Sequence, residues 1–278
     1  MLLFLMKKAS SRLINVLRLA RPLFLVGGFI FYGLGVMVAL YQEVRLDVTV
    51  LLCGQVAVTA TQLMTHFSND YYDLSADRAN TTPTRWSGGS RVLAEGLVSP
   101  RTGLWLAVAC GAVALAATAI LVGVARTGPW AVGLLLVAVA LAWFYSAPPL
   151  RLHSRGLGEL TVSLIVPVLT PAVGYTLQVG RPGWLPLLVV FPLACFQAAM
   201  ILVINFPDAA GDLQAGKRTL VVRLGAPRAR LHAALLATAY LSLPLLVGAG
   251  LPPLVGMGLL VPLPLGVAGV AHGSRSLA

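Results

Sequence analysis

Long apolar segments separated by short polar ones make up most of this chain. Each segment is between 18 and 23 residues long and holds at most one charged residue. This is the length that a helix needs to cross the hydrocarbon core of a bilayer. We therefore expect an all-α, polytopic transmembrane bundle, folded as a single domain over residues 1–278. The eight predicted spans are 23–41, 48–67, 103–125, 129–146, 158–179, 184–206, 231–249 and 251–271.

The composition is that of a membrane protein. Hydrophobic residues make up 58% of the chain and charged residues only 10%, with a mean hydropathy of +0.87. Soluble domains carry about 25% charged residues. The three cysteines, Cys53, Cys110 and Cys195, lie in apolar segments without a metal-ligand spacing, so we expect them to be core residues. The four histidines form no H-x-x-x-H pair and are not expected to bind a metal.

Basic residues between the predicted spans indicate how the chain lies in the membrane. Of the 20 lysines and arginines, 17 fall on one side of the bundle. Basic loops remain in the cytoplasm, so this side is predicted to be cytoplasmic, in a multi-pass protein of the cell inner membrane. Residues 1–22 are predicted to form a basic helix at the membrane surface, with Leu13 and Leu17 toward lipid and Lys8 and Arg12 toward headgroups.

Acidic residues gather on the same side as the basic ones. Because Asp and Glu contribute little to membrane orientation, they have no topological reason to follow Lys and Arg. In this chain, with its net charge of +11, nearly all charge of both signs therefore lies on one face, which predicts a polar site at one mouth of the bundle. Seven of the nine acidic residues are on that face: Asp70, Asp73, Asp77, Glu95, Glu159, Asp208 and Asp212.

A first acidic motif, NDYYDLSAD, follows the second predicted span. If that helix continues, Asn69, Asp73 and Asp77 are each four residues apart and share one face, with Asp70 beside them. Like charges at this spacing repel, and negative charge at a helix C-terminus is unfavourable, so the arrangement costs stability unless a cation lies among the side chains. Oxygen ligands suit a hard cation, Mg²⁺ above all when phosphate shares the site.

A second motif of the same kind follows the sixth predicted span. It consists of Asn205, Asp208 and Asp212 and again contains D-x-x-x-D. Four spans separate the two motifs, so both helices run in the same direction and end on the same side. We expect two parallel pseudo-repeats, at about residues 1–146 and 147–278, with a central cavity and the site between them.

Cationic and small residues follow the two motifs. Backbone N–H groups of Gly88, Gly89 and Ser90 could face an anion. Carboxylates interleaved with fixed cations indicate a diphosphate that is bridged by Mg²⁺ and held by Arg and Lys. The candidate cations are Arg85, Arg91, Arg151, Arg155, Lys217 and Arg218.

Several stretches resemble motifs of the UbiA superfamily of intramembrane prenyltransferases. They are NDYYDLSAD, YSAPPLRL, RGLGEL, DAAGD and GKRTLVVRLG, in the order and spacing of the family. The last is similar above all to members that act on 1,4-dihydroxy-2-naphthoate. The resemblance implies a helical bundle with a Mg²⁺-dependent site under a cytoplasmic cap. It also implies transfer of a polyprenyl group from a polyprenyl diphosphate to an aromatic acceptor, in menaquinone biosynthesis.

The resemblance also implies roles for individual residues. Asp73, Asp208 and Asp212 would be catalytic, together with Tyr145. The residues expected to bind Mg²⁺ with its diphosphate are these three aspartates, Asn69 and Asn205, with Asp70 and Asp77 as supporting ligands. Arg21 would contact the diphosphate beside Lys217 and Arg151 or Arg155. Tyr145 and Ser146 would line the pocket near the allylic carbon, where apolar walls protect a carbocation from water.

Other functions fit parts of the same pattern. A UbiA-type enzyme could use another acceptor, such as 4-hydroxybenzoate, a tetrapyrrole or a lipid. A CDP-alcohol phosphotransferase also uses Mg²⁺ and cytoplasmic aspartates, but its D-G-x-x-A-R core is absent from this sequence. A cation transporter would have its acidic residues near the middle of the membrane, whereas these lie at the ends of spans. The expected partners are the two substrates and the lipid bilayer, and we expect no nucleic-acid partner.

Overall fold

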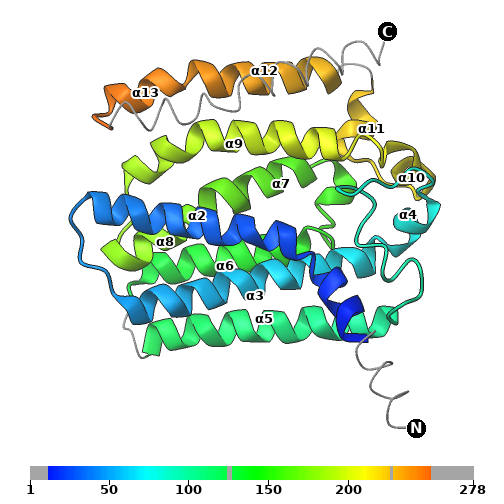
Figure 1. The fold of residues 1–278 in the computed structure, drawn as a ribbon, viewed down its shortest axis with the longest axis horizontal. Coiled ribbons are helices and arrows are strands. Elements are labelled where there is room, and N and C mark those ends of the chain that lie inside the picture. The colour runs from blue at the N-terminus through cyan, green and yellow to red at the C-terminus, as the bar shows by residue number, and fades with distance from the viewer. Residues whose placement is uncertain (1–11, 124–126, 226–227, 252–278) are drawn as a thin grey trace.

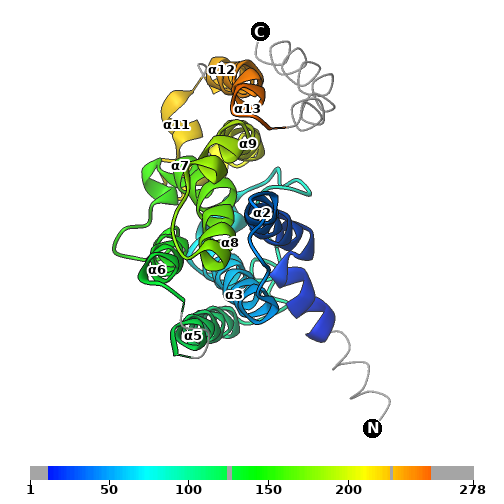
Figure 2. The same cartoon turned by 90° about the vertical axis from the view of Figure 1, so that its left-hand side faces the viewer.

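The computed structural model describes residues 12–123, 127–225 and 228–251, and this part of the chain contains helices and loops but no β-strand. The long helices lie roughly side by side, with their axes along the longest dimension of the molecule (Figure 1). Viewed along their axes, they form a bundle in which α8 lies between α2 on one side and α6 on the other (Figure 2). The prediction of an all-α membrane bundle is confirmed. The long helices are α2 (Pro22–Tyr41), α3 (Val48–Tyr72), α5 (Pro100–Gly123), α6 (Pro129–Phe144), α9 (Trp184–Ile204) and α12 (Arg228–Leu241).

Most predicted spans have a matching apolar helix. Five helical segments among the described residues are long and apolar enough to cross a membrane, at 22–41, 48–72, 100–123, 158–179 and 184–204. The spans predicted at 129–146 and 231–249 correspond to shorter apolar helices, namely α6 with its 16 residues, and α12 followed by α13 (Leu243–Gly248). The eighth predicted span, 251–271, lies outside the described residues except for Leu251.

The fifth span is not a regular α-helix. It consists of α7 (Gly158–Leu164), the π-helical turn η2 (Ile165–Leu169) and α8 (Thr170–Val179). Pro167 and Pro171 lack the N–H that would continue the α-helical bonding, which accounts for a wider turn at this point. Thr170 uses its hydroxyl to donate to the Ile165 carbonyl oxygen at 2.9 Å.

Small residues let α8 cross α2 at close range. A Cβ atom on Gly35 would come within 1.9 Å of the Pro171 carbonyl oxygen, and one on Gly174 within 2.4 Å of the Tyr32 carbonyl oxygen. Backbones that approach this closely gain van der Waals contact, which drives helix association where water supplies no hydrophobic force. This crossing fixes one wall of the space inside the bundle.

Both acidic motifs lie where a long helix gives way to a short one. Helix α3 ends at Tyr72, and α4 (Leu74–Ala79) begins after Asp73, whose φ of −95° and ψ of 5° leave the helical range. The expected continuous helix through the first motif is therefore broken at its central aspartate. In the second motif α9 ends at Ile204 and α10 (Ala209–Gln214) follows Asp208.

The two breaks change the electrostatics that a continuous helix would impose. Asp77 lies in the first turn of α4 and Asp212 in the first turn of α10, where the helix dipole favours negative charge. Helices α4 and α10 pack together at one end of the bundle (Figure 1). Gly211 allows this approach, because a Cβ atom there would lie 3.1 Å from the Cα atom of Asn80. The pseudo-repeat itself stays a prediction.

The N-terminal segment is helical where the structure describes it, and its place at the membrane surface stays a prediction. Residues 12–20 are helical, and Leu13 and Leu17 are 62% and 54% exposed. Lys8 lies outside the described residues. The chain then turns at Arg21, whose φ of 50° is left-handed, and α2 begins at Pro22, a residue suited to the first position of a helix. The guanidinium of Arg21 is thereby brought to the mouth of the bundle.

Candidate active site

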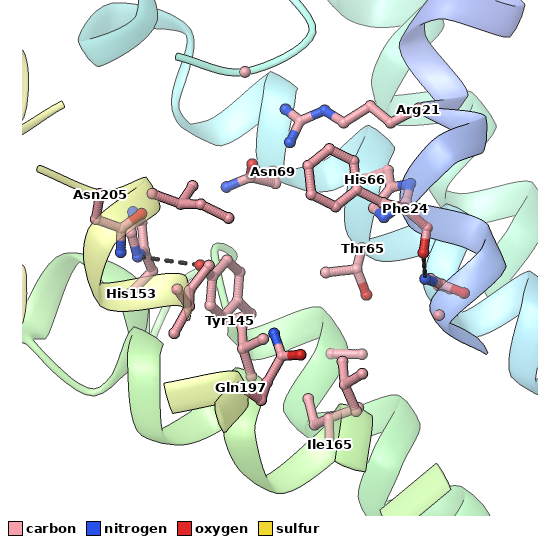
Figure 3. A pocket seen from close by; sticks show the side chains of 18 of the residues that line it. Arg21, Phe24, Thr65, His66, Asn69, Tyr145, His153, Ile165, Gln197 and Asn205 are labelled. Atoms are coloured by element: carbon pink, nitrogen blue, oxygen red, sulfur yellow. Dashed lines mark hydrogen bonds between the residues drawn. The ribbon is translucent and has the colours of Figure 1, made fainter. Parts of the chain in front are cut away.

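A cavity of about 580 Å³ lies inside the bundle. Its walls come from α2, α3, α6, α9 and the segment from α7 to α8, and its mouth lies beside α4 and α10. Figure 3 shows Arg21, Asn69 and Asn205 toward one end of this space and Ile165 toward the other. Nine of the predicted site residues line it: Arg21, Asn69, Asp73, Asp77, Tyr145, Asn205, Asp208, Asp212 and Lys217.

The first motif is fixed by bonds within itself and to the turn that follows α6. Asn69 donates from Nδ2 to Asp73 Oδ2 at 2.6 Å and to Ser146 Oγ at 3.0 Å. Ser146 is buried and does not line the cavity, so it orients Asn69. Burial and the neighbouring carboxylates of Asp70 and Asp73 raise the pKa of Asp77 to about 7. A bound cation would stabilise the charged form of this carboxylate.

The second motif is held by residues that follow the first. Asn80 donates from Nδ2 to Asp208 Oδ1 at 2.7 Å, and the Gly88 backbone N–H donates to Asp208 Oδ2 at 3.1 Å. The Thr82 N–H donates to Asn80 Oδ1 at 2.9 Å and so fixes the orientation of that amide. Burial raises the pKa of Asp208. Direct bonds thus join the second motif to the segment that follows the first, although 128 positions separate Asn80 from Asp208.

Lys217 bridges the two motifs. Its Nζ lies 3.1 Å from Asp73 Oδ2 and 3.0 Å from Asp212 Oδ1, and its side chain is only 10% exposed. Burial alone would lower the pKa of Lys217, but the two carboxylates outweigh it and raise that pKa. For Asp73, burial alone would raise the pKa, but the charges of Lys217 and His153 and the hydrogen bonds from Lys217 and Asn69 together outweigh burial and lower that pKa. One cation therefore holds a carboxylate of each motif.

Tyr145 and His153 form a stacked pair in the cavity wall. Their ring centroids are 5.1 Å apart at an interplanar angle of 23°, and the Tyr145 hydroxyl lies 3.2 Å from His153 Nδ1 (Figure 3). The other ring nitrogen of His153 lies 3.9 Å from Asp73 Oδ2. Burial and the Lys217 charge lower the pKa of His153. Burial and the Glu159 carboxylate raise the pKa of Tyr145, which keeps its phenol neutral.

Asp70 differs from the expectation of a metal ligand. It is only 1% exposed and does not line the cavity. Its carboxylate pairs with the Arg21 guanidinium and accepts from the Ser90 hydroxyl and from the Ser90 N–H, at 3.2 Å to Oδ2. Asp70 therefore holds Arg21 and the loop that contains Ser90 in place. The N–H groups of Gly88 and Ser90, expected to face an anion, are directed at carboxylates instead.

The remaining predicted cations lie outside the cavity. Arg85 is exposed over the Trp86 ring, 5.3 Å from its centroid. Arg91 donates to the Asp77 backbone carbonyl oxygen, and Arg155 to the Pro149 carbonyl oxygen at 3.0 Å. Arg218 is exposed, and its backbone carbonyl oxygen accepts from Arg223 Nε at 2.9 Å. Arg151 lines a separate small pocket beside Lys217 and Asp73, so of Arg151 and Arg155 only Arg151 approaches the site.

Several cavity residues escaped the sequence analysis. Asn80 bonds Asp208, and His66 and His153 both line the cavity. Glu159 is 3% exposed and accepts from Asn205 Nδ2 at 2.9 Å, which orients the Asn205 amide. A search for metal-ligand spacing could not find these histidines. The signal that points to His66 is its place on the helix face that also holds Asn69 and Asp73.

The residues present fit Mg²⁺ bound together with a diphosphate. Among the described residues no group of three or more His, Cys, Asp or Glu side chains is arranged to hold a metal alone. Mg²⁺ is usually bound by one or two carboxylates with substrate phosphates and waters completing its shell. Each motif offers such a set of oxygens, and Asp212 Oδ2 is buried without a hydrogen-bond partner.

Comparisons with known sequences agree with this geometry. The profile of the UbiA prenyltransferase family matches residues 28–276. A 1,4-dihydroxy-2-naphthoate octaprenyltransferase of Bacillus subtilis is 29% identical over 253 residues, which cover 89% of this chain and 78% of the relative. The protein of the same name from Mycobacterium tuberculosis is 32% identical over 191 residues, which cover 68% of this chain and 63% of the relative.

Solved structures with the same fold are also found. A UbiA homolog from Aeropyrum pernix superposes with a TM-score of 0.70 at 18% identity, over 91% of this chain and 90% of the homolog. A UbiA homolog from Archaeoglobus fulgidus, solved with GPP and Mg²⁺, gives a TM-score of 0.67 at 18% identity, over 94% of this chain and 86% of the homolog. With the family profile matching most of its length, this chain belongs to the UbiA prenyltransferase family.

Proposed function

We propose that this protein transfers a polyprenyl group from a polyprenyl diphosphate to 1,4-dihydroxy-2-naphthoate, a step of menaquinone biosynthesis. The observation that carries the proposal is the cavity with two carboxylate motifs at its mouth and apolar side chains below them. The names of the Bacillus subtilis and Mycobacterium tuberculosis relatives favour this acceptor.

The diphosphate end of the donor would lie between the two motifs. Asn69, Asp73 and Asp77 would hold Mg²⁺ on one side, and a second set would hold it on the other: Asn205, Asp208 and Asp212. When bound, Mg²⁺ stabilises the negative charge that develops on a leaving phosphate oxygen. Lys217 and Arg21 line the same end of the cavity and would contribute positive charge to the diphosphate.

The polyprenyl chain and the reacting carbon would lie deeper in the cavity. Apolar side chains exclude water, which would otherwise quench the allylic cation formed when the C–O bond breaks. The Tyr145 ring is held in place by its stack with His153 and would stabilise that cation through its π-face, a contribution of about 0.5–2 kcal/mol. A ring carbon of the acceptor then forms the new bond to the allylic carbon, diphosphate leaves the donor, and the ring regains its aromaticity by releasing H⁺ or, with loss of its carboxylate, CO₂.

The protein would lie in the inner membrane of the cell, and the mouth of its cavity would face the cytoplasm. Support comes from the loops, because 17 of the 20 lysines and arginines lie on the side that holds both acidic motifs. A diphosphate donor from the cytoplasm could then reach the site without its charged end crossing the bilayer.

A direct assay tests the proposal. Purified protein in detergent is incubated with Mg²⁺, a polyprenyl diphosphate and either 1,4-dihydroxy-2-naphthoate or 4-hydroxybenzoate, and products are identified by mass. We expect a prenylated naphthoate product that disappears with EDTA, with Asp73→Ala and with Asp208→Ala. Glu95→Gln is the matched control, because Glu95 lies on the same face outside the cavity, and its carboxylate pairs with exposed Arg18 at 3.7 Å. Full activity of either aspartate variant would refute the proposed site. A prenylated product from 4-hydroxybenzoate, with none from 1,4-dihydroxy-2-naphthoate, would refute the proposed acceptor.

A further inference from the structure

One face of α3 turns polar side chains into the cavity below the acidic motif. Gln62 and His66 are four residues apart, and Asn69 and Asp73 continue the same face toward the mouth. Thr61 and Thr65 lie beside this stripe and also line the cavity: with them, the wall made by α3 is far more polar than a lipid-facing helix would be. Polar groups in a membrane helix are costly and usually mark a functional path.

Most of these polar groups are already bonded within the protein. Thr61 and Thr65 donate to the carbonyl oxygens four residues earlier, at 2.8 and 2.9 Å. Gln62 donates from Nε2 to the Phe24 carbonyl oxygen at 2.7 Å, and its Oε1 is enclosed at Gly28, where an added Cβ atom would lie 2.2 Å away. Below Asn69 and Asp73, which belong to the acidic motif, His66 is therefore the group of this stripe that can meet a ligand.

His66 is held in one tautomer. Its Nδ1 lies 2.7 Å from the Ala20 carbonyl oxygen, and a carbonyl can only accept, so Nδ1 carries the hydrogen. The neutral ring therefore presents Nε2 as a hydrogen-bond acceptor. Among the described residues Nε2 has no hydrogen-bond partner, and the ring lines the cavity beside Phe24 (Figure 3).

One aromatic ring packs against His66, and a second ring packs against the first. The Phe24 ring meets the His66 ring edge-on with centroids 6.4 Å apart, and meets the Trp86 ring edge-on at 6.0 Å. All three line the cavity. Aromatic side chains bind another ring by edge and face contacts, worth about 0.5–1.5 kcal/mol a pair beyond the area that is buried. The corner thus combines ring contacts with a single fixed hydrogen-bond acceptor.

The facing walls have a different character. Apart from Gln197 and Thr170, the side chains that α6, α7, the π-turn, α8 and α9 give to the cavity are apolar and contain no aromatic ring. Such a surface suits a flexible hydrocarbon chain, whereas the corner at His66 suits a flat, hydroxylated ring. The apolar residues are Leu135, Ala138, Ala142, Val162, Ile165, Val166, Val173, Met200, Ile201 and Ile204.

We propose that the corner formed by Phe24, His66 and Trp86 binds the aromatic acceptor, with His66 Nε2 accepting a hydrogen bond from a ring hydroxyl. The proposal rests on the proposed function, since it assumes a hydroxylated aromatic acceptor. His66 acts here as a binding and positioning residue: it orients the hydroxyl and, by accepting its hydrogen, adds electron density to the ring that attacks the allylic carbon.

Two conservative substitutions separate this role from a structural one. In His66→Asn the amide N–H takes the place of Nδ1–H and keeps the bond to Ala20, but no acceptor remains at the position of Nε2. In His66→Gln the longer side chain puts an amide oxygen near the position of Nε2. Val56→Ala is the matched control, because Val56 lies on α3 at the lipid-facing side and is 49% exposed.

The measurement is acceptor binding by calorimetry, with Mg²⁺ and inorganic diphosphate present so that no turnover occurs. The probes are 1,4-dihydroxy-2-naphthoate and its 1,4-dimethoxy ether, which lacks the hydroxyl hydrogens. We expect His66→Asn to weaken binding of the dihydroxy compound about fivefold to tenfold, the loss of one hydrogen bond, while His66→Gln and Val56→Ala stay near wild type. The ether should bind wild type and His66→Asn with equal, weaker affinity.

Two outcomes overturn the assignment of His66. One is equal affinity of His66→Asn and wild type for the dihydroxy compound, and the other is absence of binding to wild type. Turnover with a polyprenyl diphosphate is measured separately on the same proteins. If binding depends on His66 as expected but wild type yields no prenylated product, the proposed function fails while the binding site stands.

Discussion

Lys217 provides the sharpest test of how the two motifs are held together. Its ammonium lies within 3.1 Å of one carboxylate from each motif, and the side chains of Asp73 and Asp212 are only 9% and 5% exposed. Replacement by Met keeps the length and apolar stem of the side chain and removes the charge. Two buried carboxylates then face each other without a cation.

The size of the effect follows from that burial. Removing one partner of a buried ion pair costs about 3–5 kcal/mol. Because the site opens into a cavity that admits water, we expect the lower end, about 3 kcal/mol. For a chain of this size that corresponds to an unfolding temperature lower by about 6–12 °C in EDTA. Saturating Mg²⁺ neutralises the same carboxylates, so it should stabilise Lys217→Met more than wild type. The difference between their unfolding temperatures should then be smaller than in EDTA.

Thermal unfolding in detergent, in EDTA and in Mg²⁺, measures both quantities. Arg101→Met is the control, since Arg101 is an exposed cation at the start of α5, on the side of the bundle that holds the site, and surface changes of this kind stay within about 0.5 kcal/mol. If Lys217→Met unfolds at the wild-type temperature in EDTA, the ion-pair bridge contributes nothing and the reasoning is wrong. An equal response of both proteins to Mg²⁺ would show that the metal does not reach these carboxylates.

Three further changes test other parts of the site. Asn80→Ala removes a bond of 2.7 Å to Asp208 and should raise the Mg²⁺ concentration for half-maximal activity about tenfold, with kcat at saturating Mg²⁺ largely kept; an unchanged Mg²⁺ titration would contradict this role. Gly89→Ala places a Cβ atom 2.2 Å from Asp77 Oδ2 at a φ of 72° and should strongly reduce steady-state turnover. Gly96→Ala is the control, because Gly96 has a similar φ but open space around it, and this change should leave turnover near wild type. Tyr145→Phe keeps the ring and should lower kcat less than Tyr145→Leu, and the reverse order would rule out a role for the π-face.

Much of the fold could be predicted from the sequence because membrane spans are a local property. A run of about 20 apolar residues must form a helix in lipid, since each backbone polar group needs a partner within the segment. The order of spans then puts both acidic motifs on one side. What this reasoning could not supply was the break of α3 at Asp73, because local spacing alone treats the helix as continuous.

The residues of the site could be predicted by type but not by contact. Asn69, Asp73 and Asp208 line the cavity as expected. Asp70 has the same charge as the other aspartates, but its carboxylate is bonded to Arg21 and Ser90. Spacing cannot separate these cases, because all the aspartates of the motif lie at a helix end. Only the packing of the loop after α4 decides which carboxylate is buried and which faces the cavity.

The sequence by itself determined the class of protein, the helical bundle and the pairing of two oxygen-rich motifs, because hydropathy and helical spacing act over a few residues. Tertiary structure alone decided which cation bridges the motifs, which histidine is free to meet a ligand and which arginines reach the site. The physical reason is distance along the chain. Lys217 meets Asp73, and Asn80 meets Asp208, only after helices far apart in sequence have packed together. A hydrogen bond or ion pair of about 3 Å depends on that packing and leaves no periodic signal in the sequence.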